Sequence, residues 1–128
     1  MDFFLTDPTR IPLPPEEIRI IDLSSKPLPD VDQIKVIIEI SPFQQRPNLE
    51  IEVRNLDEEI IASISIIETI TPEIDINMHM RGNPKNVTYL LSAVLYYAEI
   101  EESLDPAKPP SYPEQQVIHT REISFTYN

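Results

Sequence analysis

LEIEVRN, residues 49–55, alternates strictly between apolar and polar side chains. Successive side chains of a β-strand point to opposite faces, so a period of two predicts a strand with one buried face and one solvated face. The charged side chains of this stretch share the solvated face. We expect its buried face to consist of Leu49, Ile51 and Val53.

The same period recurs in six other segments, which are separated by prolines and by turns that contain Asn or Asp. Seven short strands of this kind predict an all-β fold, either an antiparallel sandwich or a barrel. One segment also fits a helix, because Ile60, Ile64 and Ile67 have helical spacing, but its density of β-branched side chains favours a strand. The six further segments are IRIIDL (18–23), IKVIIEI (34–40), IIASISII (60–67), IDINMHM (74–80), YLLSAVLYY (89–97) and EISFTY (122–127).

Two details resemble an immunoglobulin-like domain. The apolar parity slips between Ile20 and Ile21, as a β-bulge or a switch between sheets would produce in a first strand. The pattern Y-x-L-x-A-x-L over residues 89–95 is similar to the sixth strand of such domains, in which a tyrosine enters the core. Residues 16–127 therefore resemble an immunoglobulin-like or fibronectin type III sandwich, without the cysteine pair and core tryptophan of the antibody type. The resemblance implies an antiparallel seven-stranded immunoglobulin-like sandwich and no particular function.

The 128 residues are enough for one domain. Residues 1–15 predict an extended proline-rich arm, and residues 16–128 predict a single sandwich domain with a long proline-rich loop at about 102–116. Proline keeps such a loop extended and semi-rigid, so we favour a stiff connector along the sandwich edge, with a protein-binding tip as the alternative. The side chains of that tip would be Lys108, Pro109, Pro110 and Tyr112.

The chain is strongly acidic, with a net charge of -12, and it contains no cysteine. An acidic surface repels nucleic acid and anionic membranes, so we expect neither as a partner. The missing cysteines exclude disulfides, thiolate metal sites and cysteine nucleophiles. An acidic N-terminus and the lack of a long apolar run predict a cytoplasmic protein, and the initial methionine predicts a full-length chain.

Met78-His79-Met80 contains soft ligands that would suit Cu(I). Strand alternation argues against such a site, because both methionines would continue the core stripe while the histidine points to the opposite face. The histidine then belongs to a polar stripe that forms either a solvated face or a contact surface. We expect no metal or other cofactor here. The stripe consists of Asp75, Asn77, His79 and Arg81.

His119 and Arg121 share the parity of the core residues that follow them. Three explanations remain open: a bulge near residues 120–122, strand pairing that begins only near Glu122, or a buried and paired histidine and arginine. The last requires partners, since an unpaired buried charge is costly. As a functional pair, the two side chains would form a ligand site with nearby carboxylates. The sequence has no GxSxG, HExxH or glycine-rich phosphate motif, so we expect no catalytic residues.

Several apolar side chains have the parity opposite to the core and could form a patch on the outer face of the sandwich. Such patches commonly mark interfaces, unless the N-terminal arm or the proline-rich loop covers them. We therefore predict a non-catalytic interaction or assembly module that forms a homodimer or binds another protein. A small-ligand or metal-binding protein, or a weak enzyme, is the alternative. The predicted interface residues are Ile37, Ile61, Ile67, Leu90, Val94 and Tyr96.

Overall fold

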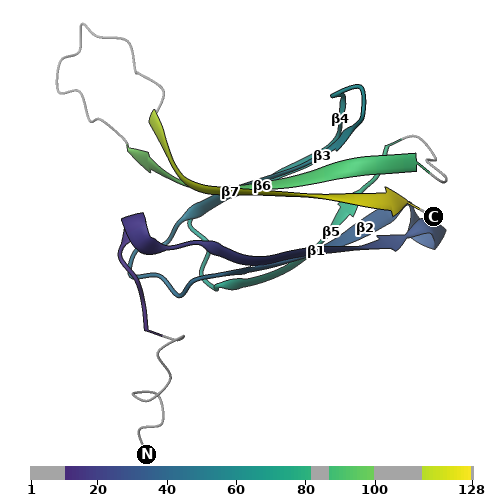
Figure 1. The fold of residues 1–128 in the computed structure, drawn as a ribbon. Coiled ribbons are helices and arrows are strands. Elements are labelled where there is room, and N and C mark those ends of the chain that lie inside the picture. The colour runs from purple at the N-terminus through teal and green to yellow at the C-terminus, as the bar shows by residue number, and fades with distance from the viewer. Residues whose placement is uncertain (1–10, 82–86, 100–113, 128) are drawn as a thin grey trace, which may run out of the picture.

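Two antiparallel β-sheets lie face to face in the computed structural model, which describes residues 11–81, 87–99 and 114–127 (Figure 1). Over these residues the sheets contain seven strands, so the predicted seven-stranded antiparallel sandwich is confirmed. The three-stranded sheet has the order β1 (Ile20–Leu28), β2 (Gln33–Ile40), β5 (Glu73–His79). The four-stranded sheet has the order β4 (Ile60–Ile66), β3 (Asn48–Asn55), β6 (Val87–Glu99), β7 (Glu114–Tyr127).

The bounds of β2, β3, β4 and β5 lie within one residue of the predicted segments. β6 and β7 extend beyond their predicted segments, and β1 begins at Ile20 instead of Ile18 and continues to Leu28. Each of the three follows a neighbouring strand beyond its own clear alternation. β7 pairs with β6 along its whole length, as far as Glu114 opposite Glu99. β1 continues through Pro27, which lies opposite Ile34. An edge strand tolerates this proline because it is paired on one side only.

The core lies between the two sheets and is built from the inward-facing parity of each strand. The prediction for residues 49–55 is confirmed, because Leu49, Ile51 and Val53 are fully buried. These side chains pack with the equivalent rows of the neighbouring strands in one continuous cluster. The other fully buried aliphatic residues of that cluster include Ile18, Ile34, Val36, Ile38, Leu91 and Leu95.

A β-bulge in β1 explains the parity slip near the start of the chain. The register with β2 shifts between Ile20 and Asp22, so Ile21 is an extra residue. Ile20 and Leu23 are consequently both buried, and Ile21 between them is exposed. One of the two explanations predicted for this slip, a bulge, is therefore confirmed.

A second bulge overturns one expectation for β4. Val53 pairs with Ala62 and Arg54 pairs with Ile60, so Ile61 is an extra residue in that strand. Strict alternation placed Ile60 inside and Ile61 outside. The structure reverses them, since Ile60 is exposed and Ile61 packs partly buried against the core. The prediction was wrong because alternation holds only where no residue is inserted.

The β3–β4 turn depends on Asn55. Its side-chain Oδ1 accepts hydrogen bonds from the backbone N–H groups of Asp57 and Glu59, at 2.9 Å each. The left-handed conformation of this turn falls on Glu58, with φ 65°. The asparagine therefore supplies a hydrogen-bond acceptor, while a glutamate adopts the conformation that glycine would favour. Gly82 lies outside the described residues.

Part of the predicted N-terminal arm lies along the sandwich. The backbone N–H of Leu13 donates to the Pro42 carbonyl at 2.9 Å, and the Gln44 N–H donates to the Leu13 carbonyl at 3.0 Å. Residues 1–10 lie outside the described part of the chain. The same holds for residues 100–113, which include most of the predicted proline-rich loop and its Lys108, Pro109, Pro110 and Tyr112. β7 begins at Glu114.

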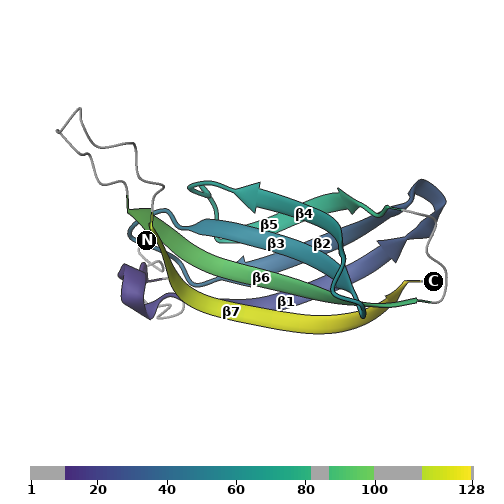
Figure 2. The same cartoon turned by 90° about the horizontal axis from the view of Figure 1, so that it is seen from above.

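The two long sides of the sandwich differ (Figure 2). On one side, here called the closed side, the edge strands β1 and β7 contact each other. On the other, here called the open side, the edge strands β4 and β5 contact each other less extensively and are joined by residues 67–72. In the part of the chain that is described, no helix is long and apolar enough to cross a membrane.

Candidate functional site

His119 and Arg121 tie β7 to β1 on the closed side. The His119 Nδ1 accepts a hydrogen bond from the backbone N–H of Ile20 at 2.8 Å. The Arg121 Nη1 donates to the carbonyl of Ile21 at 2.6 Å. Both side chains are half-buried and both reach the free edge of β1 at its bulge. Their partners are therefore main-chain groups that pairing with β2 leaves unsatisfied.

Of the three explanations considered for the parity of His119, inward-facing and paired side chains match this geometry. A bulge does occur, but at Ile118, because Leu95 pairs with His119 and Tyr96 pairs with Val117. Val117 is exposed for this reason, although its parity indicated a core position. Strand pairing extends continuously through residues 120–122.

The environment of His119 favours a neutral imidazole. Burial lowers the pKa of His119 from 6.5, and the positive charges of Arg19 and Arg121 lower it further. A nitrogen that accepts a hydrogen bond carries no proton, so Nδ1 is bare and Nε2 holds the hydrogen. His119 therefore acts as a hydrogen-bond acceptor that holds β1 in place. This structural role explains its inward-facing position without a bound ligand.

The structure confirms the alternation expected in Met78-His79-Met80. Met78 and Met80 are buried in the core, and His79 is exposed on the opposite face of β5. One metal ion cannot reach the methionines and the histidine together. Within residues 11–81, 87–99 and 114–127, no three His, Asp or Glu side chains are grouped so that they could hold a metal ion. All four residues of the polar stripe are exposed: Asp75, Asn77, His79 and Arg81.

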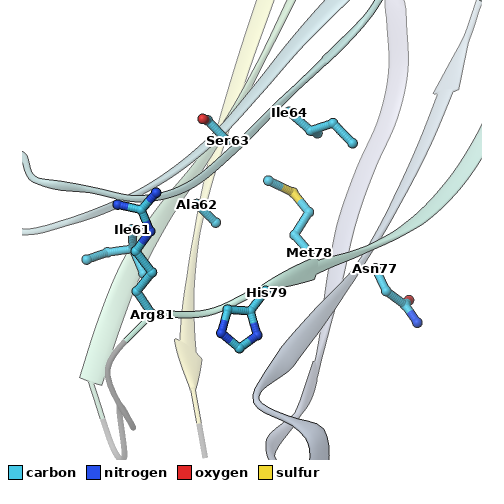
Figure 3. Close-up of a pocket in the computed structure, with 8 residues that line it drawn as sticks. All are labelled: Ile61, Ala62, Ser63, Ile64, Asn77, Met78, His79 and Arg81. Carbon is cyan, nitrogen blue, oxygen red and sulfur yellow. The ribbon is translucent and has the colours of Figure 1, made fainter.

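A hollow of about 340 Å³ lies on the open side, between β4 and the end of β5 (Figure 3). In Figure 3 the Met78 side chain extends from β5 into the space beside β4, whereas Asn77 points away from it. Arg81 and Ile61 both line the hollow. The lining is half polar and half apolar in character and open to solvent. It consists of Ile61, Ala62, Ser63, Ile64, Asn77, Met78, His79 and Arg81.

The predicted interface residues do not form one patch. Leu90, Val94 and Tyr96 lie on the outer face of the four-stranded sheet, where Leu90 and Val94 are half-buried and Tyr96 is only 4% exposed. Ile37, 41% exposed, lies on the outer face of the other sheet. Only Ile61 and Ile67 lie on the open side.

Polar neighbours surround the apolar residues of the outer face. Val94 lies between Glu50 of β3 and Thr120 of β7, and Glu50 accepts a hydrogen bond from the Ser65 hydroxyl at 2.8 Å. Leu90 lies between Arg54 and Ser124 in the same way. This face is therefore a mostly polar surface with partly covered aliphatic side chains.

Sequence reasoning predicted that Ile67 is exposed, but it missed the two other exposed isoleucines near the ends of β4, Ile60 and Ile70. Ile60 is 48% exposed at its start, and Ile67 and Ile70 are 64% and 81% exposed in the segment that follows. Ile67 was predicted as an interface residue on a sheet face, but it lies in a connection between sheets. The signal that could have found all three is the run of isoleucines continuing past the last residue of the strand.

The fold and these contacts define a small antiparallel β-sandwich domain. No family model matches the chain, and no curated protein matches it. Solved structures with a similar fold include a Lactobacillus rhamnosus β-glucuronidase, with TM-score 0.51 and 9% identity, and a Bifidobacterium dentium β-glucuronidase complexed with coumarin-3-O-glucuronide, with TM-score 0.51 and 15% identity. Each match covers 88% of this chain but only 16% and 18% of those chains. The likeness shows the fold alone.

Proposed function

We propose that this chain is a non-catalytic assembly module that self-associates through the open side of its sandwich. The observation that carries the proposal is the difference between the two sides. His119 and Arg121 occupy the free edge of β1 on the closed side. The open side instead presents a hollow and a strand with exposed isoleucines at both ends. Exposed apolar residues concentrated on one region of a surface commonly mark an interface.

Apolar contact alone supports only a weak dimer. Burying a whole isoleucine side chain contributes about 1.5–3 kcal/mol. With Ile60, Ile67 and Ile70 exposed by 48%, 64% and 81%, their burial contributes about 3–6 kcal/mol per copy. Two copies together contribute about 6–12 kcal/mol, against a cost of association of about 4–15 kcal/mol. Self-association therefore needs a further contribution, such as main-chain hydrogen bonds between copies.

The strand order supports an immunoglobulin-like arrangement for the proposed module. As in that arrangement, β1, β2 and β5 share one sheet and β3, β6 and β7 share the other. The order departs from the constant type at β4, which lies beside β3 and not beside β5. A chain with this order exposes β4 as an edge of the larger sheet. Domains of this architecture have many unrelated roles, so the proposal depends on the surface of this chain and not on its fold.

Native mass spectrometry and sedimentation velocity over a range of concentrations test the proposal. The wild-type chain should form a dimer, Ile67→Glu should shift the population to monomer, and Val94→Glu should leave the dimer unchanged. Val94 is the matched control, because it is an aliphatic residue on the outer face that was predicted as an interface. A wild-type chain that stays monomeric at every concentration contradicts self-association. If Val94→Glu dissociates the dimer and Ile67→Glu does not, the interface lies on the outer face of the four-stranded sheet.

Binding of a small ligand is the second candidate function, and the hollow beside His79 is the observation that favours it. Ser63 and Arg81 contribute further polar groups to its lining. Native mass spectrometry of the purified chain would then show a stoichiometrically bound small molecule. His79→Ala should remove that additional mass, while His119→Ala should not, because His119 lies on the closed side.

A further inference from the structure

The four edge strands of the described sandwich are not protected equally. An edge strand exposes unpaired N–H and C=O groups, and proteins commonly protect such edges with charges, proline or contacts to other elements. β4, with the sequence IIASISI, has neither a charged residue nor a proline over its seven residues. The other three edges carry such residues: Asp22, Lys26 and Pro27 in β1, Glu73 and Asp75 in β5, and Arg121 and Glu122 in β7.

We propose that the free edge of β4 pairs antiparallel with β4 of a second copy of this chain, joining the two four-stranded sheets into one. This inference rests on the proposed self-association and specifies its contacts. Main-chain pairing supplies the contribution that apolar contact alone lacks, because each new cross-strand hydrogen bond satisfies a donor on one free edge and an acceptor on the other.

The sequence of β4 suits pairing with itself about a two-fold axis at Ile64. This register uses the regular part of the strand and avoids the bulge at Ile61. Ala62 then lies opposite Ile66 of the second copy, and both side chains are on the inner face of the sheet, toward the core. Ser63 lies opposite Ser65 on the outer face, and hydroxyl pairs of this kind stabilise neighbouring strands.

The same axis brings the exposed isoleucines of the two copies together. Antiparallel pairing about Ile64 brings the start of β4 in one copy, with its bulge at Ile61, beside Ile67 of the other, so Ile60 and Ile67 lie near each other. Both isoleucines are exposed in the single chain. A second copy therefore covers apolar surface at each end of the new strand pair, which a strand of arbitrary sequence would not do.

Charge complementarity in β5 also favours a second copy as the occupant. β5 lies on the same side as β4, with Glu73 at its start and Arg81 just beyond its end, while Asp75 is paired with Lys35 of β2 in the same copy at 3.3 Å. The two-fold axis runs the two copies of β5 in opposite directions. The acidic end of each therefore lies toward the basic end of the other, which orients the pair.

The net charge of -12 on each copy does not oppose this arrangement locally. The residues of β4 itself are uncharged, so no like charges lie directly opposite one another. The nearest acidic row on the four-stranded sheet, Glu50 and Glu52, lies on β3. Three strand spacings separate the two copies of that row, about 14 Å. The Debye length at physiological ionic strength is about 8 Å, so solvent ions screen this repulsion.

Single cysteines test the pairing, because the natural chain has none. Ser63→Cys and Ser65→Cys are small changes at exposed positions and should preserve the fold. Under mild oxidation, a mixture of the two variants should form a disulfide-linked heterodimer faster than either variant alone. Ser124→Cys, at an exposed position of β7 on the same face, is the matched control and should cross-link slowly. Cross-linking from Ser63 and Ser65 no faster than from Ser124 overturns the inference.

A charge exchange tests the orientation independently. Arg81→Glu should raise the dimer dissociation constant about fivefold, by removing a partly exposed ion pair and adding repulsion. The double variant Arg81→Glu with Glu73→Arg should restore it. β4 pairing is overturned, and self-association is kept, if the wild-type chain dimerises but neither the charge variants change its dissociation constant nor the Ser63 and Ser65 cysteines cross-link faster than the Ser124 control. A wild-type chain that is monomeric throughout, as expected if the edge serves a different protein, overturns both.

Discussion

Replacing His119 removes one defined hydrogen bond and gives a measurable loss of stability. The Nδ1 atom of His119 accepts the N–H of Ile20 at 2.8 Å, and Ile20 is buried. In His119→Phe this N–H loses its acceptor, and a buried donor without a partner costs about 1–3 kcal/mol. His119→Asn should be close to wild type, because its Oδ1 can occupy nearly the position of the histidine Nδ1. Urea unfolding at about pH 7.5, where the imidazole is neutral, compares the three proteins.

The wild type and the two His119 variants also show how the free energy of unfolding depends on pH. The unfolded imidazole has a pKa of 6.5, and burial together with Arg19 and Arg121 holds the folded pKa of His119 below this value. Below pH 6.5 the unfolded chain therefore binds a proton before the folded chain does. The stability from this site is complete above pH 6.5 and is lost as the pH falls through the folded pKa, by at most about 1.4 kcal/mol per pH unit. Both variants should lack this part of the slope.

Two results would refute this account of His119. Equal urea midpoints for His119→Phe and wild type at neutral pH would mean that the bond to Ile20 contributes nothing. A wild-type pH slope in His119→Asn between about pH 7.5 and 5.5 would mean that another group titrates in this range.

Three further substitutions test other contacts. Tyr127→Phe should lower the free energy of unfolding by about 1 kcal/mol, because the buried hydroxyl donates to the Gln33 carbonyl at 3.0 Å; the urea midpoint measures this. Asn48→Ala should cost about 1–2 kcal/mol in the same assay, since its Oδ1 accepts the Glu68 N–H at 2.7 Å. Glu58→Gly should raise the melting temperature, with a gain of about 1 kcal/mol, because φ is 65° there; an unchanged or lower temperature would contradict it.

The sequence predicted the fold where its local pattern and the pairing of its strands agree. In β3, alternation identified Leu49, Ile51 and Val53 as core, because both neighbouring strands follow the same parity there. The slip at Ile20 and Ile21 was visible for the same reason, since both sides of the bulge are apolar. Local alternation is reliable wherever polar and apolar residues lie on opposite faces over several consecutive positions.

The bulges at Ile61 and Ile118 could not be located from the sequence. Each is defined by a partner strand, β3 for Ile61 and β6 for Ile118, and isoleucine suits either face of a half-buried sheet. The assignment of Ile60 was wrong for this reason. The open side was not predictable either, because it depends on β4 pairing with β3 and on β5 joining the other sheet.

Both sides of the sandwich have a β-bulge in an edge strand, but the main-chain groups at the two bulges have different neighbours. Each has a bulged edge strand, β1 at Ile21 and β4 at Ile61, and a bulge leaves main-chain groups in need of partners. On the closed side the strand across the gap offers His119 and Arg121, which reach those groups. On the open side the core-facing residue of β5 is Met78, which cannot donate a hydrogen bond to them. Arg81, beyond the end of β5, lines the same hollow as Ile61. The polar groups along the rest of the β4 edge are open to water or to another strand, and we propose that β4 of a second copy is this strand, because it would also cover the exposed isoleucines.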